Sequence, residues 1–332
     1  MATEAKPELT RQVFTTSREL EYFSEAEFVT QTGYSKAEWW PGVLVKELLD
    51  NALDVCEQAG VEPEIRVEFT GDSLAITDNG PGIPPAVVER ILDFGTRTSD
   101  KGAYVSPTRG AQGNALKTVL AIPYVLNGGR PSVVTIEAQG IRHVITVATD
   151  HIERRPQIDH RIEEIVRTDG TSIRIAVDSA SSYLPGSESG FLQRLLLDYS
   201  LFNPHADFLL DEGGELLRFE RTAPDWTKWL PVDPTSAHWY TAKRLENLIA
   251  SYVAAERTGG RVRTAREFVS EFRGLSGTAK QKQVTAETGL DRAYLHDLAA
   301  GGRIDRAAMG RLVAAMQRLS APVKPESLGV LG

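Results

Sequence analysis

One stretch, residues 44–82, constrains the fold of this chain more than any other, and it opens with a helix. In the segment LVKELLDNALD, Glu47, Asn51 and Asp54 recur at the i, i+4, i+7 spacing of one helix face, beside an apolar stripe. A polar helix face is more often simply solvated. A carboxylate and a carboxamide one turn apart can also act on one ligand, because Glu47 can take a proton from water and the Asn51 oxygen can bind a hard cation such as Mg²⁺.

The same stretch closes with LAITDNGPGIP, a predicted strand that ends at Asp78 before two closely spaced glycines. Asn-Gly and Pro-Gly pairs usually mark nothing more than a turn. In this context Asp78 can accept a hydrogen bond from an exocyclic amine, while Gly80 and Gly82 allow the backbone to approach a flat ring closely. The order of helix and strand, followed by a third, glycine-rich segment, favours a ligand site over the simpler interpretations.

Composition limits the classes of protein to consider. The chain has 332 residues, of which 41% are hydrophobic and 25% charged, so we expect a soluble globular protein with two domains. The sequence has no run of about 18 apolar residues that would span a membrane. The acidic, polar start does not resemble a secretory signal, and the single Cys56 excludes an intramolecular disulfide and a cysteine-based zinc site. We therefore expect a cytoplasmic protein.

Hydrophobic periodicity and turn residues predict an α+β fold with antiparallel or mixed strand pairs and helices on one face. A short strand or arm near residues 17–23 should precede a helix that begins at Ser24, with Ser24 and Glu27 as a capping box. We expect residues 162–167 and 171–177 to pair with each other around Asp169-Gly170. The other predicted helices are 41–58, 84–94, 114–126 and 190–203, and the other predicted strands are 65–69, 74–78, 132–138, 141–149, 207–210 and 215–219.

The glycine-rich segment from Gly95 to Val119 is a candidate phosphate site. A loop that ends at a helix N-terminus offers free N–H groups and the positive end of the helix dipole to an anion. It is not a Walker A loop, because Leu116 and not glycine precedes Lys117. The sequence also lacks His-Glu-x-x-His, Gly-x-Ser-x-Gly and a cysteine pair, so a P-loop kinase, a zincin and a serine hydrolase are unsupported.

Four motifs in this order resemble the ATP-binding boxes of the GHKL superfamily, which includes gyrase, heat-shock chaperones, histidine kinases and MutL. They are Glu47-x-x-Asp50-Asn51-x-x-Asp54, Asp78-x-Gly80-x-Gly82, Gly110-x-x-Gly113-x-Ala115-Leu116 and Gly170-Thr171-Ser172. Within the superfamily, the chain most resembles the B subunit of type IIB DNA topoisomerases (topoisomerase VI), and the likeness extends upstream to Ser17-Arg18-Glu19. The resemblance implies a Bergerat α/β sandwich with a mixed sheet over residues 1–225.

Carried over residue by residue, the resemblance implies Glu47 as the base that activates water and Asn51 as the Mg²⁺ ligand. Asp78, helped by Thr171, would recognise the adenine amino group. Ala115 departs from the glycine that topoisomerase VI and histidine kinases tend to carry there, although MutL also has Ala-Leu. The other implied nucleotide-binding residues are Asp50, Asp54, Gly80, Gly82, Thr98, Arg109, Gly110, Ala111, Gln112, Gly113, Asn114, Ala115, Leu116 and Lys117.

The charge is unevenly distributed between the two predicted domains. Residues 226–332 contain 16 Lys+Arg against 10 Asp+Glu, a balance of +6, whereas residues 1–225 contain 21 against 35, a balance of −14. A polyanion should therefore meet the C-terminal part, and Lys280, Lys282 and Arg303 are the candidate contacts with duplex DNA. Predicted helices there are 241–255, 263–272 with a capping box of Thr264 and Glu267, two short ones, and 306–319.

Three interpretations of this helical domain stay open. The topoisomerase resemblance implies a helix–two-turn–helix domain. The segment Val284–Leu290, followed by Tyr294-Leu295, instead resembles a repressor-type helix-turn-helix. The third interpretation is that these are packing helices with solvated basic side chains.

Taken together, the resemblance implies Mg²⁺-dependent ATP hydrolysis that drives homodimerisation and gating in a topoisomerase VI B-like subunit acting on duplex DNA. These 332 residues contain no match to the family's transducer domain with its lysine for the γ-phosphate, which would fit either a truncated chain or a natural minimal version. The resemblance implies that DNA cleavage would require a separate A-type subunit. One alternative is a nucleotide-gated DNA-binding or regulatory GHKL protein without topoisomerase activity. A histidine-kinase-like phosphotransferase is disfavoured, because all six histidines lie at position 143 or later.

Overall fold

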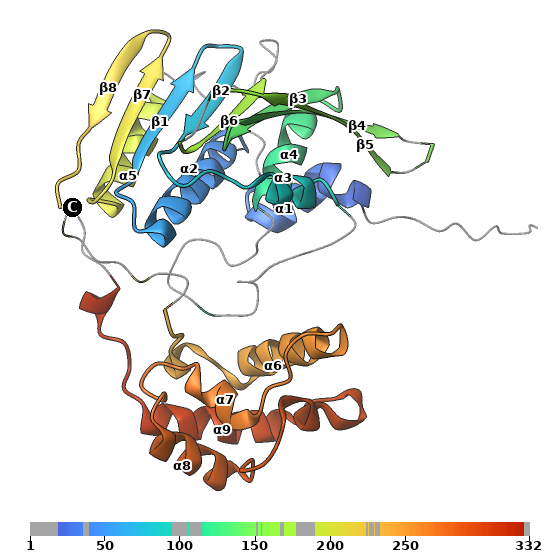
Figure 1. Ribbon diagram of the computed structural model, residues 1–332, viewed down its shortest axis with the longest axis vertical. Helices are drawn as coiled ribbons and strands as arrows, with labels where there is room; N and C mark the ends of the chain where they lie inside the picture. Colours follow the sequence, from blue (N-terminus) through green and yellow to red (C-terminus); the bar gives the residue numbers. More distant parts are fainter. Residues whose placement is uncertain are drawn as a thin grey trace, which may run out of the picture.

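The structure, a computed structural model, describes residues 19–35, 40–94, 105, 115–150, 152–153, 155–166, 169–176, 190–223, 225, 229 and 233–328. Within these residues, a twisted sheet with helices packed against one face forms one part of the molecule, and a bundle of helices forms the other (Figure 1). We call them the sheet part (residues 19–223) and the helical part (residues 233–328).

The sheet part is built on an eight-stranded mixed sheet with the order β5-β4-β3-β6-β2-β1-β7-β8. Strand β1 pairs in parallel with β7, and the other neighbouring pairs are antiparallel. The predicted α+β class with a mixed sheet is therefore confirmed. The strands are β1 Glu64–Phe69, β2 Ser73–Thr77, β3 Ser132–Ala138, β4 Ile141–Asp150, β5 Arg155–Glu164, β6 Thr171–Ala176, β7 Asp207–Glu212 and β8 Glu215–Phe219.

Helices cover the face of the sheet to which the apolar residues of each strand point. Strand β3 alternates strictly between buried and half-buried residues, as expected when only one face is covered. Helix α2 turns its apolar stripe, including Leu44, Leu48 and Leu49, into the shared core. The helices are η1 Glu19–Phe23, α1 Glu25–Thr32, α2 Trp40–Ala59, α3 Pro85–Ile91, α4 Ala115–Leu126 and α5 Phe191–Phe202.

The segment before α1 differs from the sequence prediction, because η1 is a 3₁₀ helix and not a strand or arm. Tyr22 and Phe23 are consecutive and both buried, and both rings contact Phe94, with centroids 5.4 and 4.8 Å away. Consecutive side chains of a strand would point to opposite faces, so only a tight helical turn brings both rings to one neighbour. Helix α1 starts at Ser24 as predicted, where Ser24 Oγ accepts the Glu27 N–H.

The prediction that residues 162–167 and 171–177 pair with each other is wrong. Strand β6 lies between β2 and β3, while β5 pairs only with β4 among the described strands and begins earlier than predicted, at Arg155. Burial explains the difference: four of the six β6 residues are buried, whereas β5 is largely exposed. The apolar strand takes a central position, and the charged strand takes the edge.

The helical part has its own core, in which α6, α7 and α9 contribute Leu248, Phe268 and Leu312 among others. The predicted capping box is present at the start of α7, and Gly289 ends α8 with a φ of +74°. The boundary at residues 225/226 stays a prediction, because the structure describes few residues there. The elements are η3 Ala237–Trp239, α6 Ala242–Arg257, α7 Ala265–Ser270, α8 Thr278–Thr288, η4 Leu295–Gly302, α9 Arg306–Leu319 and η5 Pro325–Ser327.

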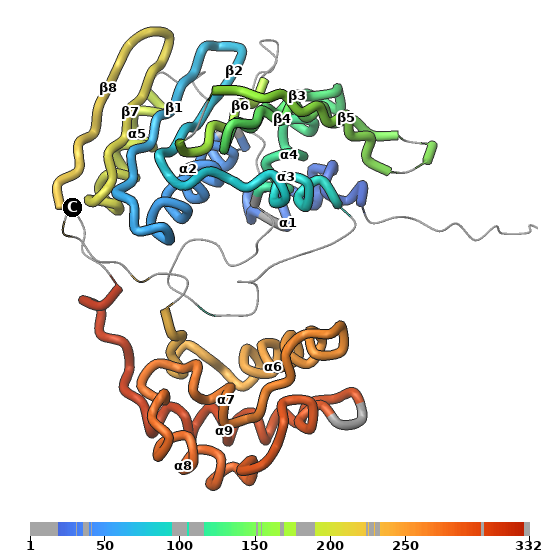
Figure 2. The backbone as a smooth tube through the Cα atoms, viewed as in Figure 1, coloured from blue at the N-terminus to red at the C-terminus, as the bar shows by residue number. Residues whose placement is uncertain are grey.

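The backbone trace of Figure 2 shows the helical part as a group of elements distinct from the sheet. In neither part do the described residues include a helix that is both long and apolar enough to cross a membrane.

Candidate functional site

The turn after β2 is held by the side chain of Asp78. This carboxylate is 8% exposed, and its Oδ1 accepts the N–H groups of Gly80, at 2.8 Å, and Thr171, at 3.2 Å. The Asp78 N–H in turn donates to the Thr171 carbonyl at 2.9 Å, and Thr171 Oγ1 accepts the Ile83 N–H at 3.1 Å. The structure thus joins two predicted site residues that lie 93 positions apart in the sequence.

The glycines around this turn are required by close packing. Gly170 has a φ of +69°, and a Cβ there would lie 1.8 Å from the Asp78 carbonyl oxygen. A Cβ on Gly80 would lie 2.6 Å from Val55 Cγ1 of α2, and Gly82 has a φ of +80°. Contact with α2 therefore explains the glycine at position 80. The sequence had instead suggested that this glycine lets the backbone approach a bound flat ring.

This contact fixes how the polar face of α2 meets the turn. Asn51 precedes Val55 by four residues and Glu47 precedes it by eight, so all three lie along one stripe of the helix. With a rise of about 1.5 Å per residue, Asn51 lies about 6 Å and Glu47 about 12 Å along the axis from the point where α2 touches Gly80. A ligand bound at Asp78 can therefore extend along α2 past Asn51 to Glu47.

The side-chain amide of Asn51 is an orphaned polar group. Its Nδ2 atom is buried and has no hydrogen-bond partner among the described residues. The two ends of an amide are assigned from such networks, so either the oxygen or the nitrogen can occupy this position. A buried polar atom without a partner costs about 1–3 kcal/mol, which a ligand could offset.

These residues fit the Mg²⁺ that the resemblance implies. A carboxamide oxygen is a suitable ligand, and Mg²⁺ is commonly bound through one or two protein groups together with phosphate oxygens and water. The described residues include no cluster of three or more His, Cys, Asp or Glu side chains that would hold a metal alone. A Mg²⁺ ion at Asn51 would therefore depend on phosphate oxygens. Asp54 lies half-buried on α2, next to Val55.

Asp50 has a different environment from Asn51 and Glu47. Its carboxylate accepts from Lys46 Nζ at 2.7 Å and from Tyr199 Oη of α5 at 2.9 Å, so it joins α2 to α5. Lys46 Nζ also lies 3.3 Å from Glu47 Oε1. Burial alone would lower the pKa of Lys46, but its contacts with Asp50 and Glu47 outweigh this effect and raise it. The i, i+4 spacing of Lys46 and Asp50 was the available sequence signal for this pair, whereas nothing local pointed to Tyr199.

Much of the predicted phosphate segment lies outside the described residues, namely Thr98 and residues 109–114. Helix α4 begins at Ala115, immediately after it, and Leu116 packs against the core. Lys117 is only 2% exposed and donates from Nζ to the Asp93 carbonyl at 2.5 Å. This ammonium therefore stabilises the chain after α3, a role that its position in the motif did not indicate.

Two residues near the site were missed from the sequence. Asn79 Oδ1 accepts the Glu64 N–H at 2.9 Å and Nδ2 donates to the Glu62 carbonyl at 2.9 Å, so Asn79 joins the turn to the start of β1. Cys56 is buried beside it, and burial together with the charge of Asp78 raises the pKa of its thiol to about 12. The Asn-Gly pair indicated a turn but not these contacts.

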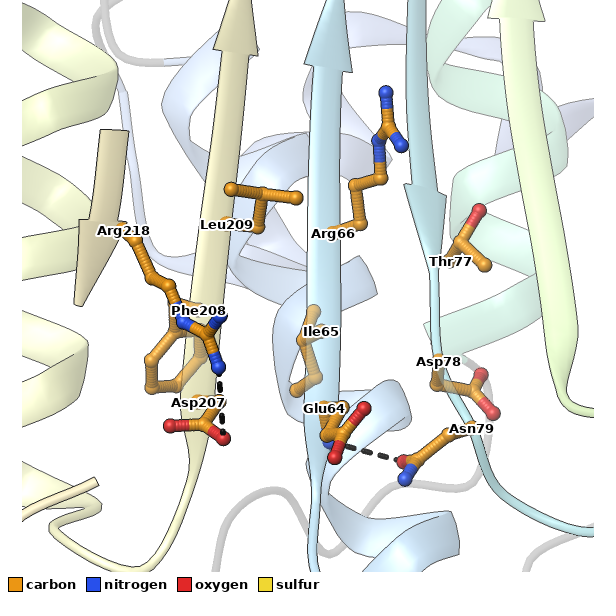
Figure 3. Close-up of a pocket in the computed structure, with 10 residues that line it drawn as sticks. All are labelled: Glu64, Ile65, Arg66, Thr77, Asp78, Asn79, Asp207, Phe208, Leu209 and Arg218. Carbon is orange, nitrogen blue, oxygen red and sulfur yellow. Dashed lines mark hydrogen bonds and ion pairs between the residues drawn. The ribbon is translucent and has the colours of Figure 1, made fainter. Parts of the chain in front are cut away.

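A pocket of about 310 Å³ lies at the ends of β1, β2 and β7 (Figure 3). Charged side chains on the uncovered face of the sheet, including Arg66 and Arg218, line it. Of the predicted nucleotide-binding residues, only Asp78 belongs to its lining. This pocket is therefore distinct from the stripe formed by Glu47 and Asn51.

The three candidate DNA-binding residues are exposed on the helical part. Lys280 donates from Nζ to the Gly274 carbonyl at 2.9 Å at the start of α8. Lys282 and Arg303 form no ion pair with other described residues. The structure leaves these side chains accessible, and contact with DNA stays a prediction.

Residues 40–147 match the family model described as histidine kinase-, DNA gyrase B- and HSP90-like ATPase. This range contains α2, the turn at Asp78 and the start of α4. The chain carries a GHKL-type ATPase domain.

The curated relatives of this GHKL chain include B subunits of type 2 DNA topoisomerase 6. The one from Archaeoglobus fulgidus is 30% identical over 217 residues, covering 61% of this chain and 34% of the relative. The one from Natronomonas pharaonis is 28% identical over 253 residues, covering 69% and 30%. The chain is thus distantly homologous to the topoisomerase VI B subunit over part of its length, and the match spans about a third of these relatives.

Among solved structures, the Aquifex aeolicus MutL ATPase domain complexed with ADP aligns with 63% of this chain and 68% of its own, at 18% identity. The TM-score is 0.34, which is too low to support a structural argument.

Proposed function

We propose that this chain binds ATP together with Mg²⁺ and hydrolyses it, as a topoisomerase VI B-like subunit that acts on duplex DNA. The observation that carries the proposal is the stripe of Glu47 and Asn51 on α2, which leads away from the buried carboxylate of Asp78 and contains the orphaned amide of Asn51. The GHKL family match supports the nucleotide, and the distant homology to the topoisomerase VI B subunit supports the DNA substrate.

Each of the three side chains has a separate role in this proposal. Asp78 accepts a hydrogen bond from the adenine amine, since a carboxylate can accept about four hydrogen bonds and donates none. Asn51 holds Mg²⁺, which supplies positive charge to the phosphate oxygens. Glu47 takes a proton from the attacking water. Lys46 Nζ, 3.3 Å from Glu47 Oε1, helps to orient that carboxylate.

The phosphates would lie near the N-terminus of α4. Residues 110–114 directly precede Ala115 in the sequence, and the positive end of the α4 dipole favours an anion at that end of the helix. Ala115, where related boxes tend to have glycine, lies in α4, and alanine is fully compatible with a helical position.

Duplex DNA would bind the helical part, whose balance of +6 contrasts with the −14 of residues 1–225. Lys280, Lys282 and Arg303 would contact backbone phosphates, which gives little sequence preference and strong dependence on salt. ATP would promote homodimerisation, and a separate A-type subunit would cleave the DNA. The homodimer and the A-type subunit follow from the distant homology alone.

ATP turnover by the purified chain, with and without duplex DNA, tests the proposal. We expect turnover that requires Mg²⁺ and changes when DNA is added. No turnover under either condition, at protein concentrations that allow dimers, would contradict the assignment as an ATPase.

A second candidate is a nucleotide-gated DNA-binding protein without useful turnover. Val105, which lies in the sequence between α3 and α4, donates to Tyr240 Oη at 2.9 Å and accepts from Thr235 Oγ1 at 2.7 Å, and this link to the helical part favours communication between the two parts. This candidate predicts that ATP changes the affinity for DNA although no phosphate is released, so the two measurements together separate the candidates.

A further inference from the structure

Asp50 uses its two carboxylate oxygens for two different partners. Its Oδ2 accepts from Lys46 Nζ at 2.7 Å, one helical turn back on α2, and its Oδ1 accepts from Tyr199 Oη of α5 at 2.9 Å. Lys46 Nζ also lies 3.3 Å from Glu47 Oε1. The contacts therefore form one series of described residues, from Tyr199 through Asp50 and Lys46 to Glu47, the proposed general base.

The Lys46 ammonium is held more closely by Asp50 than by Glu47. Hydrogen bonds from an ammonium to a carboxylate are usually about 2.7–2.9 Å long, so the 2.7 Å contact with Asp50 is strong and the 3.3 Å contact with Glu47 is weaker. A close ion pair with Glu47 would favour its ionised form and make it a poorer proton acceptor. Asp50 thus keeps the ammonium near enough to orient Glu47 without pairing with it closely.

The Tyr199 hydroxyl fixes the orientation of the Asp50 carboxylate. It has one hydrogen to donate, and it lies 2.9 Å from Asp50 Oδ1 but 3.3 Å from the Lys46 carbonyl oxygen. The charged acceptor at the shorter distance is preferred, and this leaves Oδ2 facing the ammonium. The Tyr199 ring packs edge-on against Phe208 of β7 with the centroids 6.3 Å apart. The hydroxyl is therefore positioned by α5 and the sheet rather than by α2.

Burial distinguishes this series from an ordinary surface ion pair. The side chains of Asp50 and Glu47 are 14% and 25% exposed, and that of Lys46 is 40% exposed. Burial would lower the pKa of Lys46, but Asp50 and then Glu47 outweigh this effect and raise the pKa. The ammonium form is therefore maintained, with Asp50 as the stronger of its two partners.

We propose that Tyr199 and Asp50 are positioning residues for hydrolysis, which orient the proposed general base Glu47 through Lys46. This role rests on the proposed function, whereas the contacts themselves do not. The family resemblance implied a nucleotide contact for Asp50 and gave no role to Tyr199. Positioning predicts a loss in the chemical step at unchanged nucleotide affinity, because the proposed adenine contact at Asp78 lies outside the series.

The variant Tyr199→Phe tests the proposal on the full chain, because it keeps the ring and removes only the hydroxyl. Tyr124→Phe is the matched control: it removes a buried hydroxyl of α4 that lies 2.5 Å from Thr149 Oγ1, a neutral partner outside the series. Both variants are measured for kcat of ATP hydrolysis and for equilibrium binding of a fluorescent ATP analogue.

We expect Tyr199→Phe to lower kcat about 3- to 10-fold and to bind the analogue as the parent does, which also shows that the variant is folded. Tyr124→Phe should keep both values. Parental turnover by Tyr199→Phe, or a loss of analogue affinity as large as the loss of turnover, would overturn the proposal.

A double variant separates positioning from a general structural role. In Lys46→Met the link between Asp50 and Glu47 is absent, so adding Tyr199→Phe should lower kcat no further. A further 3- to 10-fold loss in Lys46→Met/Tyr199→Phe would show that the hydroxyl acts independently of Lys46, and this would overturn the proposal.

Titration of the Lys46 ammonium by NMR spectroscopy, on the chain without nucleotide, tests the contacts independently of hydrolysis. We expect the pKa of Lys46 to be lower in Asp50→Asn than in the parent, because its stronger partner is lost, and lower in Tyr199→Phe, because Oδ2 is no longer held toward the ammonium. A parental pKa in both variants would overturn the series. If the parent chain hydrolyses no ATP, the proposed function fails, while this titration still decides whether Tyr199 and Asp50 hold Lys46.

Discussion

The sheet part and the helical part both pair many basic residues with acids, but two of the candidate DNA contacts in the helical part lie outside such pairs. On the uncovered face of the sheet, the Arg66 guanidinium lies 2.8 Å from the carboxylates of both Glu68 and Asp211. After β8, the Arg221 guanidinium lies 2.9 Å from the Asp207 carboxylate. Burial would raise the pKa of Asp207, but its bonds to Arg221 outweigh this and lower it. In the helical part, Arg263 pairs with Glu271 at 3.1 Å and Arg306 with Glu246 at 3.4 Å in the same way. Lys282 and Arg303, however, have no acidic partner within the described structure.

This difference indicates a division of labour. The sheet part belongs to residues 1–225, whose balance of −14 repels a polyanion beyond the range of single contacts. In the helical part, Lys282 and Arg303 face solvent without an ion pair among the described residues, and phosphates can bind them there. The proposed ATPase chemistry belongs to the first part and the proposed DNA contact to the second, so Glu47 should affect hydrolysis most and Lys280 with Lys282 should affect DNA binding most.

The largest expected effect is on catalysis in the sheet part. Glu47→Ala should lower ATP turnover by about 10²–10⁴-fold, because the proposed general base is lost, while nucleotide affinity stays close to that of the parent. Steady-state turnover and equilibrium binding are the two measurements. Glu89→Ala, which removes an exposed acid on α3, serves as the control. Parental turnover by Glu47→Ala would assign the proton transfer to another group.

The next effect is on the stability of the sheet part. Gly170→Ala places a Cβ 1.8 Å from the Asp78 carbonyl oxygen at a positive φ, whereas Gly213→Ala has a similar φ of +63° and no atom within 4 Å. Both should lose about 1–3 kcal/mol from backbone strain, and Gly170→Ala about 1–3 kcal/mol more from the clash. Denaturant unfolding measures the difference. Equal losses would mean that the turn relaxes freely.

In the helical part, we expect a change in salt dependence. Replacing Lys280 and Lys282 together by alanine should weaken binding of duplex DNA and reduce the slope of log affinity against log salt by about 2, if each contacts one phosphate. The charge-matched control replaces Lys243 on α6 and Lys324, which directly precedes η5. ATP turnover without DNA should not change. DNA binding equal to that of the parent at every salt concentration would favour the packing-only interpretation of these helices.

The smallest expected effect is on the pH dependence of stability. His143 is buried, and its Nδ1 lies 2.9 Å from His160 Nε2. Burial and the neighbouring His160 lower the pKa of His143, although Glu89 acts in the opposite direction. The unfolded chain therefore takes up a proton near pH 6.5 that the folded chain binds only at lower pH.

It follows that the free energy of unfolding decreases as the pH falls below about 6.5, by at most about 1.4 kcal/mol per pH unit from this residue. Denaturant unfolding between pH 7.5 and 5.5 measures the slope. His143→Gln should flatten it, and an unchanged slope would place the responsible groups elsewhere.

Local features of the fold could be predicted from the sequence. The limits of α2, the hairpin of β1 and β2 and the capping box at Thr264 depend on nearby residues, so periodicity and turn chemistry were sufficient. The central position of β6 and the parallel pairing of β1 with β7 depend on burial across the whole sheet. No short segment contains that information.

The candidate site shows the same limit. Its motif residues were found because they share a helix face or a turn, as Glu47 with Asn51 and Asp78 with Gly80. The contact of Asp50 with Tyr199 spans 149 positions and that of Val105 with Tyr240 spans 135, and these could not be predicted. The sequence therefore indicated the proposed chemistry better than the contacts that support it.

The central claim is that an adenine nucleotide binds along α2 from Asp78. Competition of ATP and GTP against a fluorescent ATP analogue, on the parent chain and on Asp78→Asn, tests it most directly. We predict saturable, Mg²⁺-strengthened binding that ATP displaces far better than GTP. Asp78→Asn should weaken ATP binding by about 5- to 150-fold, because a mispaired buried hydrogen bond costs about 1–3 kcal/mol. The same variant should reduce the preference for ATP over GTP. ATP binding of equal strength in the parent and in Asp78→Asn would contradict the account.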